Sequence, residues 1–473
     1  MITRRQLLTS GTALLGTAAL APLARLAGAR QADRILLQAE PAEAALMDEP
    51  GRMTPVWAYN ARTPGPVLRV RRGAKLRVRL QNNLQQPTSI HWHGIRINND
   101  MDGVVGLTQE AVPPGATFDY EFDVPDAGTF WYHPHHRTWE QMARGLYGML
   151  IVEEDAPPEF DRELNFVADD WRLDSAGQID AKSFGNLMDW AHQGRLGNWL
   201  TVNGASEAEF VVRSGERLRL RCANVANARI FEFDFDPKIT NAHVIALDGQ
   251  PVDPVEVAPD GLLLAPAQRA DLMLDITGTP GQVIPIYART GRERIQVAHF
   301  KIADTPPLRS GRPPEPVRLP DNPVARGLDS AGAQSIPLIM EGGAMGSLRQ
   351  AFYKGELLDI RTLARKGKVW SFNTIVGMPA KPLAQIARGR TALINMVNKT
   401  AWPHAMHLHS HHFQVVERDG MRIAGAPWRD TELVRRDVQV KIAFVADNPG
   451  KWLFHCHMLE HQAAGMLTWI EVS

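Results

Sequence analysis

The chain has no excess of charge of either sign, since 52 Lys and Arg residues balance 52 Asp and Glu residues. A balanced chain offers little attraction to nucleic acid or to an anionic membrane, so neither is expected as a partner. Cysteine is scarce: only Cys222 and Cys456 are present, so a metal bound by either one would exclude an intrachain disulfide. After residue 29 no run approaches the roughly 18 apolar residues of a membrane-spanning helix, so we expect no stable span in the mature chain.

The first residues have the features of an export signal. Arg4 and Arg5 precede an apolar, small-residue run from Leu14 to Leu26, and residues 27–29 read Ala-Gly-Ala, which is typical of a cleavage site. We therefore predict a twin-arginine-like signal peptide at residues 1–29 and recognition by the twin-arginine export machinery. A chain with so few disulfide candidates would otherwise suggest the cytosol. The signal instead predicts a periplasmic or otherwise exported protein.

One sequence pattern recurs three times along the chain. In each copy a glycine precedes an asparagine by nine residues, and apolar side chains occupy alternate positions between them. The three pairs are Gly73 and Asn82, Gly215 and Asn224, and Gly389 and Asn398. Alternation with a period of two predicts a strand with one buried face. The copies lie far enough apart for each to belong to its own domain.

These patterns predict an all-β chain of three Greek-key β-sandwich domains. The expected domain ranges are 30–155, 156–303 and 326–473. Residues 304–325, which are rich in proline and poor in apolar side chains, are expected to form a linker between the last two domains.

The segment from His455 to His461, which reads His-Cys-His-Met-Leu-Glu-His, carries the most distinctive chemistry. Side chains alternate along a strand, so His455 and His457 would point one way and Cys456 the other, towards two different metal sites. Cys456, His461 and a more distant histidine, with Met466 as a weak axial ligand, make the ligand set of a blue-copper centre. The other interpretation, a buried cysteine among core histidines, does not explain the further histidine pairs.

Histidines recur in pairs two residues apart in the first and last domains. The pairs are His91 and His93, His133 and His135, His407 and His409, and His455 and His457. Each pair projects two imidazoles from one strand face, so a site at the interface of the outer domains is expected. The middle domain has Ile230 to Phe233 in the corresponding place and is expected to hold no copper. Eight imidazoles exceed the four ligands of a structural zinc site and suit a cluster of three coppers.

With these motifs the chain resembles the bacterial three-domain multicopper oxidases, a laccase-like group of exported enzymes, over essentially all of its length after the signal. The resemblance implies cupredoxin-like domains and four copper ions, namely one blue type 1 copper, one type 2 copper and a type 3 pair. It also implies that one-electron oxidations of a reducing substrate are coupled to the four-electron reduction of O2 to water. Electrons would enter at the blue copper and pass through Cys456 to the cluster.

The same resemblance assigns the ligands. It implies that the blue copper is held by His404, Cys456, His461 and Met466. It implies that the type 2 copper is held by His91 and His407, and the paired coppers by His93, His133 and His457 on one side and by His135, His409 and His455 on the other.

Proton handling is expected to differ from that of many relatives. Gln462 follows the blue-copper His461, where relatives often have a carboxylate. Asp102, eleven residues after His91, matches the other carboxylate that the family places near the cluster. We therefore predict that Asp102 is the main catalytic proton-handling residue, with a simple turn cap as the alternative.

The chain lacks the features with which relatives oxidise cuprous ion. It has no Met-rich insertion, and no acid or methionine immediately precedes His404. Trp402 stands there instead and would suit an aromatic donor, so we predict a phenolic, laccase-like substrate. The alternative is a metallo-oxidase for Cu(I) or Mn(II), for which Met340 and Met345 could offer soft ligands, although methionine more often fills gaps in a core. A copper-free scaffold protein is disfavoured because the ligand set is intact.

Overall fold

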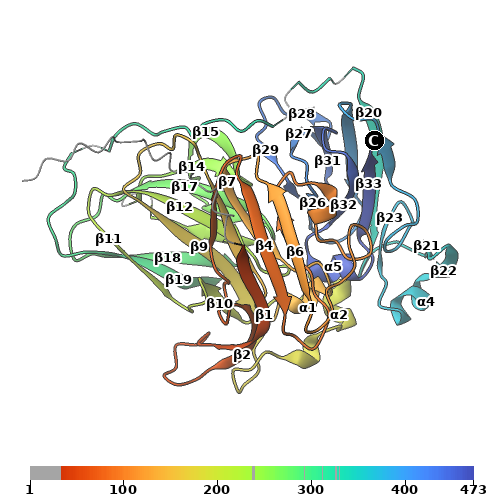
Figure 1. The fold of residues 1–473 in the computed structure, drawn as a ribbon, viewed down its shortest axis with the longest axis horizontal. Helices are drawn as coiled ribbons and strands as arrows, with labels where there is room; N and C mark the ends of the chain where they lie inside the picture. Colours follow the sequence, from red (N-terminus) through yellow and green to blue (C-terminus); the bar gives the residue numbers. More distant parts are fainter. Residues whose placement is uncertain (1–33, 237–239, 292, 312, 325–326, 330) are drawn as a thin grey trace, which may run out of the picture. The chain divides into compact units, whose positions relative to one another are not determined.

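The structure is a computed structural model that describes residues 34–473 apart from 237–239, 292, 312, 325–326 and 330 (Figure 1). The signal peptide predicted at residues 1–29 lies outside the described residues. Within them, no helix is long and apolar enough to cross a membrane.

Residues 35–153 form two sheets that share one core. The strands are β1 (Ile35–Ala44), β2 (Thr54–Tyr59), β3 (Leu68–Arg71), β4 (Lys75–Asn82), β5 (His91–His93), β6 (Thr117–Asp123), β7 (Gly128–His133) and β8 (Gly148–Glu153). One sheet has the order β2-β1-β4-β6 and the other β3-β8-β7-β5. Leu80, Trp92 and Leu150 from the two sheets belong to the same apolar cluster.

Residues 162–302 repeat this plan. The strands are β9 (Arg162–Trp171), β10 (Trp199–Val202), β11 (Ala208–Val212), β12 (Arg217–Asn224), β13 (Phe231–Asp234), β14 (Ala242–Leu247), β15 (Gln250–Glu256), β16 (Leu262–Leu264), β17 (Arg269–Asp275), β18 (Val283–Thr290) and β19 (Glu293–Ile302). The two sheets have the orders β10-β9-β12-β17-β14-β15 and β11-β19-β18-β13-β16. Their facing side chains form a separate core around Phe166, Leu220 and Phe233.

Residues 334–472 form the third pair of sheets. The strands are β20 (Gln334–Gly342), β21 (Gln350–Tyr353), β22 (Glu356–Asp359), β23 (Trp370–Phe372), β24 (Ala384–Ile386), β25 (Thr391–Asn398), β26 (His404–Leu408), β27 (Phe413–Arg418), β28 (Met421–Arg422), β29 (Trp428–Arg429), β30 (Thr431–Val434), β31 (Gln439–Val445), β32 (Gly450–Cys456) and β33 (Leu467–Val472). One sheet runs β23-β20-β25-β31-β27-β28, with β29 on β27, and the other runs β24-β33-β32-β26-β30. A small hairpin, β21-β22, lies beside them.

The three copies of the recurring pattern occupy equivalent places. They are β4, β12 and β25, and each pairs in parallel with the first strand of its domain and antiparallel with a later one. The predicted alternation is confirmed in β4, where Leu76, Val78 and Leu80 are buried and Lys75 and Arg79 are exposed. One pair of sheets lies inside each predicted domain range, while the exact domain boundaries remain predictions.

In the part of the chain that the structure describes, the named helices are few and short. They are η1 (Asn99–Met101), α1 (Thr138–Gln141), η2 (Ala181–Ser183), α2 (Leu187–Ala191), α4 (Ile360–Arg365) and α5 (Leu459–Ala463). Of these, α5 follows directly on β32 and contacts both α1 and α2 (Figure 1). This helix of the last domain is therefore in contact with elements of the first and middle domains, which matters for the site described next.

Candidate metal centre

Four strand segments bring the predicted histidine pairs together. β5 pairs with β7 so that His91 lies opposite His133, and β26 pairs with β32 so that His407 lies opposite His455. Across the two domains the rings pack face to face, with centroids 3.9 Å apart for His91 and His409. All eight side chains are buried, namely His91, His93, His133, His135, His407, His409, His455 and His457.

The side-chain nitrogens converge in groups of three. Within each of the following sets, one ligand atom per residue lies within 4.8 Å of the others. The sets are His93, His133 and His457; His135, His409 and His455; and His91, His93 and His407. The first two sets combine residues of the first and last domains in the groupings expected from the sequence, and the third contains the pair expected for the type 2 copper.

Hydrogen bonds fix one nitrogen of several rings and leave the other free. His91 Nδ1 donates to the Asp102 carbonyl at 2.8 Å and His407 Nδ1 to the Asp430 carbonyl at 2.9 Å. The Nε2 atom of each of these two rings has no hydrogen-bond partner among the described residues. His93 has the reverse arrangement: its Nε2 lies 3.3 Å from Asp430 Oδ1, while its Nδ1 finds no partner in the described part of the chain. Buried, unpartnered imidazole nitrogens are costly unless a cation engages them, so this donor set fits copper.

The buried rings are held in the form that binds metal. Burial, and after it the neighbouring histidines, place the pKa of His133, His135, His409 and His457 well below the ordinary value. The imidazoles are therefore neutral at pH 7, and a neutral imidazole offers a lone pair to a metal.

A second, separate group surrounds the cysteine. Cys456 Sγ lies 3.6 Å from His404 Nδ1 and 3.8 Å from His461 Nδ1, and all three side chains are fully buried. The far nitrogens are already engaged: His404 Nε2 lies 2.8 Å from Thr400 Oγ1, and His461 Nε2 donates to the His192 carbonyl at 2.7 Å. Both Nδ1 atoms therefore face the sulfur.

Met466 and the protonation of the sulfur complete the description of this group. Met466 is fully buried, and its carbonyl accepts a hydrogen bond from the backbone N–H of Cys456 at 3.1 Å. Burial raises the pKa of the Cys456 thiol to about 12. The thiol therefore keeps its proton at neutral pH until a metal displaces it.

Asp102 lies against the histidine cluster. Its side chain is fully buried, Oδ2 accepts a hydrogen bond from His409 Nδ1 at 2.9 Å, and Oδ1 lies 3.2 Å from His91 Nδ1. The residue also caps η1, because its backbone N–H donates to the Asn99 carbonyl at 3.2 Å. Asp102 therefore both contacts the cluster and caps a turn, so its position agrees with the predicted proton-handling role and with the alternative role as a turn cap.

Sequence reasoning missed the other carboxylate at the cluster. Asp430 immediately precedes β30 and contacts His93 and His407 through its side chain and its carbonyl. It also binds Arg269, which comes from the middle domain. Neither residue has a spacing that marks it in the sequence, because the contact depends on how three domains meet.

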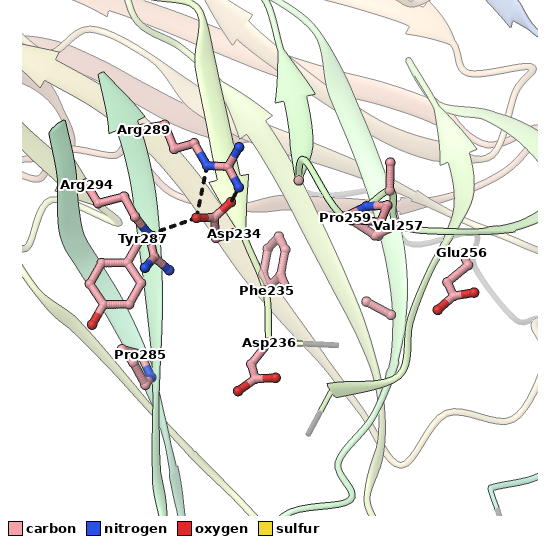
Figure 2. A pocket seen from close by; sticks show the side chains of 13 residues that line it. Asp234, Phe235, Asp236, Glu256, Val257, Pro259, Pro285, Tyr287, Arg289 and Arg294 are labelled. Atoms are coloured by element: carbon pink, nitrogen blue, oxygen red, sulfur yellow. Dashed lines mark hydrogen bonds and ion pairs between the residues drawn. The ribbon is translucent and has the colours of Figure 1, made fainter. Parts of the chain in front are cut away.

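A cavity of about 710 Å³ in the middle domain is a different feature. Figure 2 shows Arg289 and Arg294 both directed at Asp234, with Nη2 of Arg289 2.5 Å from Oδ1 and Nε of Arg294 2.9 Å from Oδ2. Its cations are thus already paired with a carboxylate, and none of the predicted metal ligands lines it. We do not place the metal chemistry there.

Family models place the chain among known proteins. Three models, each described as multicopper oxidase, match residues 42–157, 165–297 and 351–473. The chain is 31% identical over 454 residues to the multicopper oxidase MmcO of Mycobacterium tuberculosis, covering 90% of this chain and 84% of that protein. It is 29% identical over 446 residues to laccase-1 of Fomitopsis schrenkii, covering 85% and 80%.

Solved structures agree with these matches. A multicopper oxidase from Pseudomonas thermotolerans superimposes with a TM-score of 0.80 at 32% identity, covering 93% of this chain and 99% of that one. Lac15 from a marine microbial metagenome gives a TM-score of 0.73 at 40% identity, covering 93% and 100%. The predicted all-β fold of cupredoxin-like domains is confirmed. The reaction of these enzymes couples the oxidation of a reducing substrate to the reduction of O2 with copper as cofactor, and on sequence, fold and site alike the chain belongs to the multicopper oxidase family.

Proposed function

We propose that the chain is a laccase-like oxidase that binds four coppers, one at Cys456 and three among the eight cluster histidines, and oxidises phenols. When bound, the coppers would accept electrons one at a time and deliver four of them to dioxygen. The ligand assignment made from the sequence is supported by the three convergent sets of nitrogens and by the separate sulfur-centred group.

The chain itself links the two sites through β32. Cys456 lies between His455 and His457, so one peptide unit on either side joins the sulfur-bearing residue to an imidazole of the cluster. The three side chains are held in place because the backbone N–H of Cys456 donates to Met466 and that of His457 donates to Ala405. This short covalent connection supports electron transfer from one site to the other.

Asp102 is proposed to hold and pass on a proton at Oδ1. This oxygen accepts no hydrogen bond from the described residues, whereas Oδ2 accepts one from His409. Asp102→Asn should keep the shape of the side chain and slow oxygen reduction, with an altered pH profile of turnover. Unchanged turnover and an unchanged pH profile would show that Asp102 only caps η1.

Trp402 carries the proposal of an aromatic substrate. The imidazole edge of His461 is closed, because its Nε2 donates to the His192 carbonyl at 2.7 Å. The half-buried Trp402 ring stands edge-on to the His192 ring, with centroids 5.4 Å apart. A donor would therefore contact Trp402 and His192 rather than His461 directly, and an indole face favours stacking with a phenol ring.

Of the two methionines considered for the metal-oxidising alternative, Met345 alone is accessible. Met340 is fully buried in the apolar core, so it fills space there and could not meet a cuprous ion in solution. Met345 is 77% exposed and follows Ala344, whose carbonyl accepts a hydrogen bond from Trp402 Nε1 at 3.1 Å. A structural relative from Campylobacter jejuni is described as a metallo-oxidase, and a relative in Pseudomonas syringae as copper resistance protein A.

We also propose that the protein is exported. The proposal rests on the arginine pair, the apolar run and the small-residue site within residues 1–29. Fractionation of cells with and without Arg4→Lys and Arg5→Lys tests the twin-arginine route. Export that persists in the double variant and depends on a different translocase would contradict it.

Oxygen uptake by the copper-loaded chain tests the proposed reaction. A dimethoxyphenol, Cu(I) and Mn(II) are offered separately, and Cys456→Ser is the control because it removes the sulfur ligand. Uptake with the phenol in the unmodified chain, absent from the control, is expected. Uptake with Cu(I) alone, or phenol oxidation that requires added copper, would favour the metallo-oxidase instead.

A further inference from the structure

The middle domain contributes no predicted copper ligand, yet one of its side chains reaches the cluster. Arg269, the first residue of β17, is fully buried and makes a two-point ion pair with Asp430 of the last domain. Nη1 donates to Oδ1 at 2.9 Å and Nη2 donates to Oδ2 at 2.6 Å. A planar guanidinium fixes both the position and the orientation of a carboxylate in this geometry.

Asp430 in turn touches two proposed ligands. Its Oδ1 lies 3.3 Å from His93 Nε2, and its carbonyl accepts a hydrogen bond from His407 Nδ1 at 2.9 Å. Thr431 Oγ1 donates to Asp430 Oδ1 at 2.8 Å and lies 3.2 Å from His407 Nδ1. Asp430 therefore governs which nitrogen of His93 and of His407 is left for a metal, as carboxylates that hydrogen-bond to metal ligands commonly do.

The guanidinium is fixed by all three domains. Arg269 Nε donates to the Thr129 carbonyl of the first domain at 3.2 Å, and Nη1 donates to the Ala267 carbonyl at 3.0 Å. The preceding residue adds a contact, because Gln268 Nε2 donates to the Thr431 carbonyl at 3.0 Å. The start of β17 thus braces the first domain against the last at the cluster.

Space for the ion pair is made at Gly94, which follows the ligand His93. A Cβ atom there would lie 2.5 Å from Arg269 Nη2 and 2.6 Å from Asp430 Oδ2. A side chain at residue 94 would therefore displace the guanidinium or the carboxylate.

We propose that Arg269 is a positioning residue of the trinuclear cluster, which holds Asp430 so that His93 and His407 present their free nitrogens to copper. This inference rests on the proposed ligand assignment. The middle domain, for which no copper ligand is predicted, would then supply a buried cation that orders ligands on both neighbouring domains.

The chain offers a matched control in Arg217 and Asp275. This pair joins β12 to β17 within the middle domain, and both of its side chains are buried. It likewise has two contacts, Nε to Oδ1 at 2.7 Å and Nη2 to Oδ2 at 2.8 Å. The Arg217 guanidinium donates to the carbonyls of Pro314 and Glu315 rather than to any residue at the cluster. Breaking it tests the loss of a buried ion pair without touching the ligands.

The test measures copper binding site by site in the full chain. Arg269→Lys, Arg269→Met, Asp430→Asn and the control Arg217→Met are titrated with copper. The blue absorption band reports the Cys456 site, and the electron paramagnetic resonance signal of type 2 copper and the near-ultraviolet band of the paired coppers report the cluster. For Arg269→Met we expect about 10- to 100-fold weaker binding at the cluster, with an unchanged blue band.

Lysine keeps the charge but cannot engage both carboxylate oxygens, so Arg269→Lys should fall between Arg269→Met and the unmodified chain. Arg217→Met should keep normal cluster signals. Cluster binding of normal affinity in Arg269→Met, or an equal loss in Arg217→Met, would overturn the inference. If Arg269→Met does not fold, Arg269→Lys and Asp430→Asn decide by the same criterion.

Absence of cluster copper from the unmodified chain would overturn the ligand assignment and this inference with it. Normal cluster signals without phenol oxidation would contradict the proposed substrate alone.

Discussion

Gly94→Ala should destabilise the protein far more than an alanine in an ordinary glycine turn. Gly94 has φ +86°, which costs an alanine about 1–2 kcal/mol. The new Cβ would also lie 2.5 Å from Arg269 Nη2, 2.6 Å from Asp430 Oδ2 and 3.0 Å from Phe130 Cδ1. Separating this fully buried ion pair adds about 3–5 kcal/mol, because each charge would be left without its partner. The sum is about 4–7 kcal/mol, a large part of the roughly 5–15 kcal/mol of a typical domain.

Gly73→Ala provides the matched control in the same domain. Gly73 has φ +74°, and none of the described atoms lies within 4 Å of a Cβ placed there, so only the backbone term should appear. The assay is urea unfolding of the copper-free variants, followed by tryptophan fluorescence. A Gly94→Ala variant that loses no more stability than Gly73→Ala would refute the argument that the ion pair fills this space.

Three further predictions concern pH, the axial ligand and the substrate. Burial, and next the Asp430 carboxylate, raise the pKa of Asp248 to about 6. An unfolded aspartate titrates near 3.9, so the folded chain holds the extra proton between about pH 4 and pH 6, and stability should fall by up to about 3 kcal/mol as pH rises through that window. Asp248→Asn should remove this dependence when unfolding of the copper-free chains is compared across pH, and an identical pH dependence in both chains would contradict it. Met466→Leu removes the axial thioether from a fully buried position and should raise the reduction potential of the blue copper, measured by redox titration of the blue band; an unchanged potential would mean that Met466 is not a ligand. Trp402→Ala should raise KM for phenols more than it lowers kcat, in steady-state oxygen uptake, while Cu(I) oxidation is unaffected; equal losses with both donors would argue against Trp402 as the phenol contact.

Local sequence patterns were enough to predict the β architecture. The alternation after Gly73 determines a strand with Leu76, Val78 and Leu80 on its buried face, and the same alternation of burial returns in β25. The prediction of one buried face is wrong for β12, where all of Arg217–Asn224 is buried, because Arg219 and Arg221 pair with the buried Asp271 carboxylate. Strand geometry also predicted that His455 and His457 would face away from Cys456. The structure shows this separation. His455 Nε2 lies 3.1 Å from His409 Nε2 in the cluster, while the Cys456 sulfur lies beside His404 Nδ1.

What depends on contacts between domains could not be predicted in this way. Arg269 and Asp430 are 161 residues apart in sequence, and no local period or spacing relates them. The closed edge of His461 likewise depends on the carbonyl of His192, which the middle domain supplies. Met340 and Met345 appeared equivalent in the sequence, but the first is fully buried and the second is 77% exposed.

The location of copper in crystals of the loaded protein tests the account most directly. Anomalous difference maps collected at the copper absorption edge distinguish copper from other metals. The account predicts one peak bounded by His404, Cys456 and His461, and three peaks among the eight histidines of the first and last domains. A single peak within the histidine cluster, or none beside Cys456, would contradict it.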